Sequence, residues 1–177
     1  MSHSTSSARA RLVIAALALG LLAACGPSHV VVEGRFPEPL VQQQPLDIGL
    51  YLDEDFRTHQ FSDEGASPGN ASWVVQTGEA QVEMWDTLFG GMFQSLTYLD
   101  APPSGAGVAD VDAVLVPHVE ELQYAIPAHT NVKVYEIWMR YRFELLTPEG
   151  EPIGDWQMTS YRKTPTAFLR SDEAALN

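Results

Sequence analysis

Cysteine is almost absent from this sequence, and basic residues are scarce. The 177 residues include one cysteine, so the chain cannot form an internal disulfide. Ten Lys and Arg residues against 23 Asp and Glu residues give a formal net charge of -13. A surface of this sign repels phosphate backbones, so nucleic acid is excluded as an expected partner. It also repels anionic lipid, which predicts that the folded body stands off a membrane except where it is anchored.

Long apolar runs are also missing, except for one near the amino terminus. Residues 12–24 (LVIAALALGLLAA) are apolar throughout, but this run is shorter than the about 20 residues that a membrane-spanning helix needs. Residues 1–11 before it contain two arginines and no acidic residue. A basic segment followed by a short apolar core is typical of a signal peptide.

The apolar run ends in the motif Leu22-Ala23-Ala24-Cys25, which resembles the lipobox of bacterial lipoproteins. The resemblance implies that residues 1–24 are removed, that the Cys25 thiol receives a diacylglyceryl group and that its new amino group is acylated. Several acyl chains anchor a protein stably in a membrane. The alternative is an ordinary secretory signal with a chance cysteine. The mature chain would keep no thiol, and it would carry eight basic and 23 acidic residues.

Gly26 follows the cysteine. In the lipoproteins that this motif resembles, an aspartate at that position often retains the protein in the inner membrane. Its absence implies an outer-membrane lipoprotein on the periplasmic side.

The rest of the chain divides into three predicted segments. Residues 25–45 hold four prolines and a glutamine run, which favour an extended tether, although Val30–Val32 alternatively forms a short edge strand. Residues 46–170 form the folded domain. Residues 171–177 resemble the capped start of a helix that ends too soon, which predicts a frayed or truncated tail.

Hydrophobic periodicity predicts the fold class. Apolar residues at spacings of three and four predict a helix over 78–96, capped by Thr77, with Trp85 and Phe89 on its buried face. Alternation predicts strands over 46–52, 97–100, 111–124, 132–146 and 153–161, the last two joined as a hairpin. The Gly90-Gly91 pair inside the helix predicts close approach to a sheet or a kink. We therefore expect an α+β domain, with one long helix packed on a mainly antiparallel sheet of four or five strands.

No motif for catalysis, nucleotide binding or metal binding is present. His118 and Glu120 share a strand face, which supplies half of a metal site, but a solvated strand edge is the simpler interpretation. Acidic residues at 53–55, 63 and 64 lack the spacing of a calcium loop and are interpreted as a solvated loop. We expect no cofactor, no metal and no catalytic residue.

Three residues on one predicted strand form the candidate binding surface. Trp138, Arg140 and Arg142 alternate with an apolar row and therefore share the opposite face. Trp and Arg are favoured at protein interfaces. The alternatives are that the helix covers this face, or that cross-strand acids such as Asp155 neutralise the arginines.

The order of elements is similar to that of periplasmic accessory lipoproteins, such as outer-membrane activators of peptidoglycan synthases, the curli-secretion lipoprotein and the amino-terminal domain of the Tol-system propeller protein. The resemblance covers residues 46–170 and carries over no functional residue. It implies a non-enzymatic, lipid-anchored protein that binds or helps assemble envelope components, with an envelope protein as its partner. The alternative function is an envelope hydrolase or carbohydrate-active enzyme that uses acidic residues.

Lipidation at Cys25 is directly testable. We expect Cys25→Ser to abolish acylation and to release the protein from the membrane fraction, because serine offers no thiol to the diacylglyceryl group. Intact-mass measurement of the wild-type protein checks the modification itself. A mature wild-type chain with a free Cys25 thiol would refute the lipobox assignment.

Overall fold

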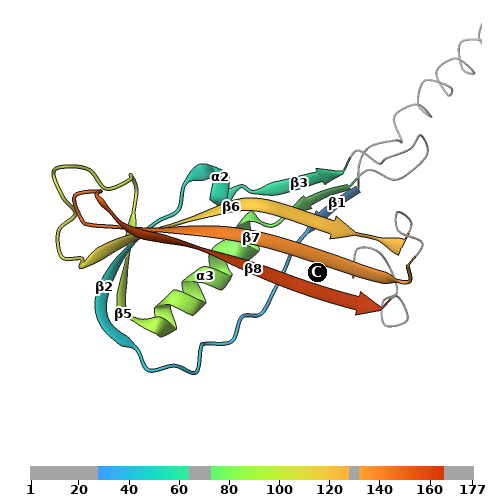
Figure 1. Cartoon of the computed structure of the whole chain (residues 1–177), viewed down its shortest axis with the longest axis horizontal. Coiled ribbons are helices and arrows are strands. Elements are labelled where there is room, and N and C mark those ends of the chain that lie inside the picture. Colours follow the sequence, from blue (N-terminus) through green and yellow to red (C-terminus); the bar gives the residue numbers. More distant parts are fainter. Residues whose placement is uncertain (1–27, 64–72, 128–131, 166–177) are drawn as a thin grey trace, which may run out of the picture.

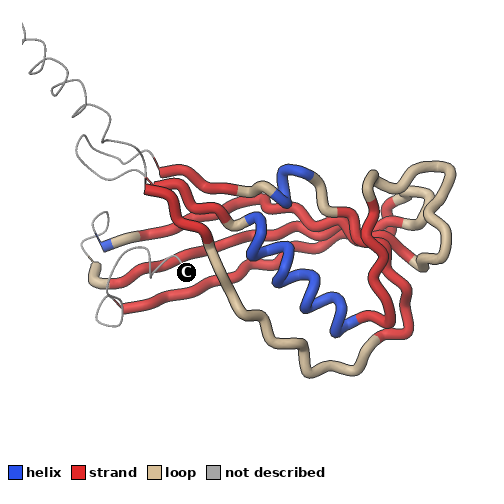
Figure 2. Tube along the Cα trace, turned by 180° about the vertical axis from the view of Figure 1, so that it is seen from behind, coloured by secondary structure: helices blue, strands red, loops and turns tan. Residues whose placement is uncertain are grey.

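Strands dominate the computed structural model, which describes residues 28–63, 73–127 and 132–165 (Figures 1 and 2). Eight strands form two sheets in this part of the chain, and two helices accompany them. In chain order the elements are β1 (Ser28–Val31), β2 (Gln44–Tyr51), α2 (Glu54–Arg57), β3 (Gln60–Asp63), β4 (Trp73–Gln76), α3 (Gly78–Met92), β5 (Phe93–Leu99), β6 (Ala113–Ala125), β7 (Val134–Leu146) and β8 (Pro152–Pro165).

The larger sheet has the strand order β5-β2-β6-β7-β8. Strand β2 pairs in parallel with both β5 and β6, whereas β6, β7 and β8 are antiparallel. The turn between β7 and β8 closes through a hydrogen bond from Gly150 N–H to Thr147 C=O at 2.9 Å, and Gly150 has a φ of 91°. Glycine adopts a positive φ without strain, so Gly150 allows the tight turn that joins β7 to β8.

The smaller sheet has the order β1-β4-β3, with β1 parallel to β4 and β3 antiparallel to it. Val30 of β1 and Val75 of β4 are buried. Residues 32–43, which we call the strap, leave β1 and pass α3 before β2 begins (Figure 2). The segment that the sequence predicts as a tether thus contains both β1 and the strap. Strand β1 agrees with the alternative of a short strand at Val30–Val32.

Aromatic packing holds α3 against one face of the larger sheet, which we call the inner face. Trp85 stacks on Phe89 at a ring-centroid distance of 5.1 Å and contacts Phe143 edge-on at 4.7 Å. Its ring also lies 5.2 Å from that of Tyr141. Trp85 and Phe89 are 2% and 4% exposed, so the predicted buried face of the helix is confirmed.

The predicted fold class is wrong. Eight strands in two sheets make the described residues mostly β, and α3 is a short helix rather than a long one. The predicted helix over 78–96 ends at Met92, because Phe93 is extended and begins β5, which pairs with β2. Phe93 and Leu96 still pack against the core, now from a strand, and that burial produced the helical spacing. Thr77 makes no side-chain cap; its hydroxyl lies 2.6 Å from His59 Nδ1.

The aromatic contact between α3 and β7 predicts the effect of one substitution. We expect Phe89→Ala to lower the free energy of unfolding by about 3–5 kcal/mol, because it removes a large side chain from a packed core and leaves a cavity. Chemical denaturation monitored by circular dichroism measures the change. Leu88→Ala, on the half-buried flank of the same helix turn, is the control and should cost less. Equal midpoints for Phe89→Ala and the wild type would mean that this helix face does not bear on the core.

Candidate functional site

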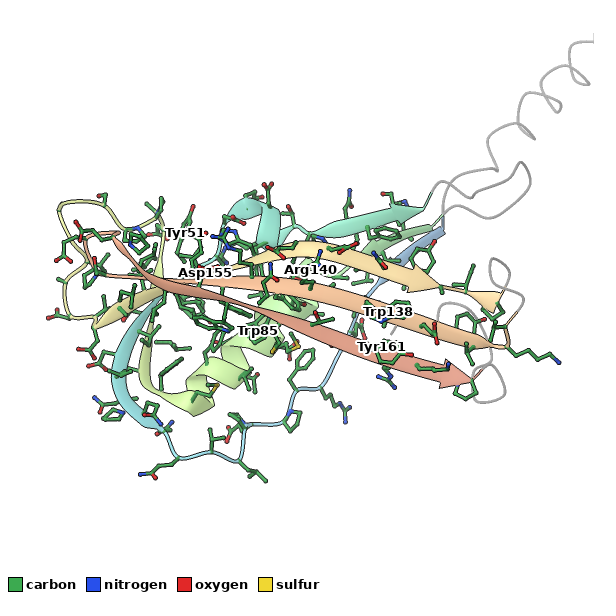
Figure 3. All side chains as sticks on the ribbon, in the orientation of Figure 1. Tyr51, Trp85, Trp138, Arg140, Asp155 and Tyr161 are labelled. Carbon is green, nitrogen blue, oxygen red and sulfur yellow. The ribbon has the colours of Figure 1, made fainter. Side chains whose placement is uncertain are left out.

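The predicted interface residues Trp138, Arg140 and Arg142 lie in a row along β7 (Figure 3 labels the first two). Strand alternation directs them to the outer face of the sheet, because the alternate residues Met139, Tyr141 and Phe143 face α3. The helix therefore does not cover this face, which removes one of the two alternatives.

On the outer face, acidic side chains pair with both arginines, as the second alternative predicts. Arg140 Nε lies 3.1 Å from Glu120 Oε2, and its Nη2 also meets Glu121. Arg142 Nη2 lies 2.6 Å from Glu144 Oε1, and its Nε lies 3.5 Å from Asp155 Oδ2. Both arginine side chains remain 40–44% exposed, so these pairs fix the guanidinium groups in place without removing them from solvent.

An aromatic pair continues the row toward the carboxyl end of β8. The rings of Trp138 and Tyr161 lie 5.0 Å apart, and Tyr161 donates a hydrogen bond to Glu136 at 3.2 Å. Lys163 Nζ lies 2.8 Å from the same carboxylate and, as a hydrogen-bond donor, lowers the pKa of Glu136. Desolvation and the Glu136 charge raise the pKa of Tyr161, which keeps its hydroxyl protonated as a donor.

Strand β8 is one edge of the larger sheet and β5 is the other. Sequence reasoning missed the exposure of β8. Every side chain from Pro152 to Lys163 is exposed. Trp156 and Met158, on the inner side, are 45% and 40% exposed, and Ile153 and Tyr161 are also exposed. Trp156 stacks on Phe143 at 5.3 Å, so it extends the core beyond the reach of α3. Alternation predicted the strand correctly, but nothing in its own sequence distinguishes an edge strand from a covered one.

A second candidate site is an apolar cavity of about 160 Å³ on the inner face. Its walls come from the strap, from α3 and from β7, with Ser160 of β8 at its rim; the side chains are Val32, Phe36, Thr77, Ala80, Gln81, Met84, Ile137, Met139 and Tyr141. Gln81 is buried and donates a hydrogen bond to Phe56 C=O at 2.5 Å. Burial raises the pKa of Tyr141 to about 12, so the phenol at the cavity wall is neutral. The cavity suits an apolar group of the size of a benzene ring.

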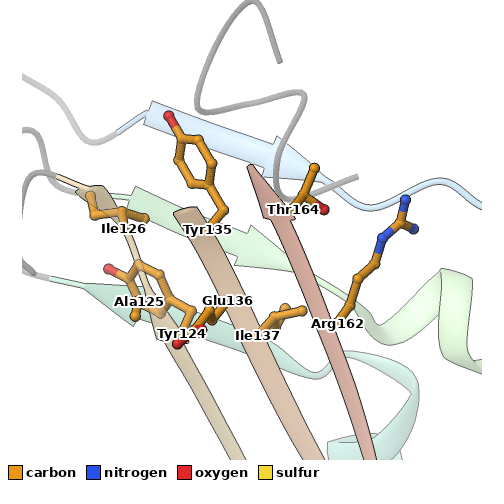
Figure 4. A pocket seen from close by; sticks show the side chains of 8 residues that line it. All are labelled: Tyr124, Ala125, Ile126, Tyr135, Glu136, Ile137, Arg162 and Thr164. Carbon is orange, nitrogen blue, oxygen red and sulfur yellow. The ribbon is translucent and has the colours of Figure 1, made fainter. Parts of the chain in front are cut away.

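Two further hollows lack the surroundings of a glycoside-hydrolase site. The cavity in Figure 4, between the ends of β6, β7 and β8, has a volume of about 10 Å³, which is room for one water molecule. A depression of about 500 Å³ beside α3 holds Glu79, Glu83 and Asp86. All three carboxylates are exposed, whereas the acid of a glycoside hydrolase needs apolar surroundings that keep it protonated.

The remaining candidates have structural partners. His118 Nδ1 lies 3.7 Å from Asp53 Oδ2, and its Nε2 lies 3.9 Å from Glu144 Oε2. Glu120 meets Arg140 and Gln157, and a register shift of β6 lies between Val119 and Glu121. Asp53 caps α2 by accepting a hydrogen bond from Phe56 N–H at 2.7 Å. Among the described residues, no three His, Cys, Asp or Glu side chains are grouped to hold a metal ion.

Several predictions lie outside the described residues: the signal peptide, lipidation of Cys25 and the tail over 171–177. Within the described ranges, no helix is both long and apolar enough to cross a membrane.

Comparison with known proteins supports the fold and no more than the fold. No protein-family model and no curated protein matches the chain. Among solved structures it matches protein XCC0632 of Xanthomonas campestris, of family DUF330, with a TM-score of 0.52 and 12% identity over 84% of this chain and 83% of that one. The chain shares its fold with XCC0632.

A second solved structure is lipoprotein GNA1162 of Neisseria meningitidis, with 15% identity over 72% of this chain and 88% of that one. Its TM-score is 0.31, too low to carry an argument.

The resemblance of the domain to the Tol-system propeller protein stays a prediction, as does the absence of catalysis.

Two adjacent glycines test how the strap is held beside the apolar cavity. A Cβ on Gly91 would lie 2.5 Å from Pro39 Cδ of the strap, whereas a Cβ on Gly90 would meet nothing within 4 Å. We expect Gly91→Ala to destabilise the protein by roughly 1–3 kcal/mol through this clash. We expect Gly90→Ala to leave stability unchanged or to raise it by up to about 1 kcal/mol. Thermal unfolding of the two variants measures the difference. Equal shifts in the unfolding temperature would show that Pro39 does not pack closely against α3 at Gly91.

Proposed function

We propose that this protein is a lipid-anchored, periplasm-facing lipoprotein of the outer membrane that binds an envelope protein through the β8 edge. The lipobox ending at Cys25 supports the anchor, and Gly26 supports the outer-membrane location. The partner contributes an extended segment that lies beside β8 as a further strand. The proposal assigns no catalysis to the chain.

The exposed β8 edge is the observation that carries this proposal. Natural proteins protect edge strands by keeping them short, or with charges, prolines or bulges. Strand β8 has 14 residues, its prolines are at its two ends, and residues 156–161 (WQMTSY) contain no charge. Alternate N–H and C=O groups of an antiparallel edge point away from the sheet, where an added strand pairs with them.

The side chains of β8 set the chemistry of the partner segment. On the inner side an added strand lies beside Trp156 and Met158, which favours apolar side chains at alternate positions. On the outer side it lies beside Asp155 and, one strand further in, the acids that surround Arg140 and Arg142. Because the whole chain is acidic, basic side chains on that face of the partner would speed and orient docking.

Site-directed photocrosslinking in intact cells tests the proposal. We expect a benzophenone side chain at position 158 to capture one protein, and crosslinks from positions 156, 158 and 160 to map to alternate residues of one partner segment. Met158→Lys should weaken that complex roughly tenfold, because a lysine on the edge opposes strand addition. Tyr98, on β5 and 46% exposed, is the control site for both the crosslinker and the lysine. Capture from position 98 equal to that from 158, or crosslinks scattered over many proteins, would overturn the assignment.

A further inference from the structure

The end of the molecule that carries the amino terminus of the domain has a composition of its own. Strands β1, β4 and β7 begin at this end, and β3, β6 and β8 finish there (Figures 1 and 2). The rings of Phe61 in β3 and Tyr124 in β6 meet at 5.0 Å, which ties the two sheets together at this place. We call this end the anchor end and the opposite end, with loops 100–112 and 147–151, the distal end.

Chain length fixes the anchor end relative to Cys25. Strand β1 begins at Ser28, three residues after the cysteine. Three fully extended residues span at most about 11 Å. A lipidated Cys25 lies at the membrane interface, where the headgroup layer of each leaflet is several ångströms thick. The start of β1, and with it the anchor end, therefore lies within about 11 Å of the lipidated cysteine at the membrane interface.

Charge is distributed unevenly between the two ends. The described part of the anchor end exposes the basic residues Lys133 and Arg162 together with the apolar Val132, which is 52% exposed. Lys163 there is paired with Glu136. The two distal loops hold five acidic residues and no basic one: Asp100, Asp110, Asp112, Glu149 and Glu151. Asp63, the last residue of β3, also lies at the anchor end. The anchor end thus carries charges of both signs, whereas the two distal loops carry only the negative charge that anionic lipid repels.

We propose that the anchor end rests on the membrane surface, with Lys133 and Arg162 against anionic phospholipid headgroups and Val132 at the interface. This inference rests on lipidation at Cys25, as stated under the proposed function. It extends the expectation, drawn from net charge, that the body stands off the membrane except at its anchor: the whole anchor end of the domain, and not the lipidated residue alone, meets the membrane. The distal acidic loops then point away from the bilayer, and β8 runs outward from it.

Depth-dependent quenching tests this orientation on the full lipidated protein. Because a lipidated Cys25 offers no thiol, single cysteines at Val132→Cys and Ala106→Cys can each carry one fluorophore; Ala106 lies in an exposed distal loop. The protein is placed in vesicles of phosphatidylethanolamine and phosphatidylglycerol with a nitroxide on the lipid headgroup. We expect severalfold stronger quenching at position 132 than at position 106. Replacing Lys133 and Arg162 with glutamate should reduce the quenching at position 132.

The controls separate this inference from the proposed function. Intact mass and co-flotation with vesicles establish whether the chain is lipidated and bound. Equal quenching at positions 132 and 106 in a protein that is lipidated and vesicle-bound would overturn the orientation and leave the anchor in place. An unlipidated chain that does not float with vesicles would overturn both the anchor and this inference.

Discussion

The aromatic contact between α3 and β7 is the constraint on which the rest of the structure depends. Trp85 and Phe89 pack against Tyr141 and Phe143, so these alternate residues of β7 must face inward. Because successive side chains of a strand point to opposite faces, Trp138, Arg140 and Arg142 lie on the outer face. Because α3 covers β7 rather than β8, Trp156 of β8 is only half covered by its stack on Phe143. The core and the exposed surface therefore have a single cause.

Parallel pairing explains the second feature of the fold, the long connections around the sheet. Strand β2 pairs in parallel with β5 and β6, and parallel neighbours require crossovers that pass over a face. Helix α3 lies on the connection between β2 and β5, and the strap brings the chain from the smaller sheet to β2 along the same face. The close contact of Pro39 with Gly91 and the hydrogen bond of 3.2 Å from Gln43 Nε2 to Gly90 C=O hold the strap against the helix. The apolar cavity is the space between these three layers.

Sequence periodicity predicted the local elements better than their assembly. The hairpin of β7 and β8, the buried face of α3 and the outward row at Trp138, Arg140 and Arg142 follow from short-range alternation, and the structure has all three. The helix was extended too far because Phe93 and Leu96 keep its spacing, although their burial comes from parallel pairing with β2. Strand β1 is hidden among prolines, and its partner β4 lies far along the chain. Edge exposure of β8 depends on which strand ends the sheet, a property of the whole topology and not of its residues.

Strand direction limits the symmetric assemblies open to an anchored chain. Two β8 edges that pair antiparallel are related by a two-fold axis perpendicular to the sheet, which reverses the long axis of one copy. Strand β8 finishes at the end where β1 begins, so such a dimer places the starts of its two β1 strands at opposite tips. If the chain is lipidated at Cys25 and β8 runs outward from the bilayer, as proposed, such a dimer would lift one lipid anchor by about 45 Å, the length of a 14-residue strand. Under that proposal two copies held in one leaflet would not pair antiparallel through this edge, which leaves it open to a chain of a different kind.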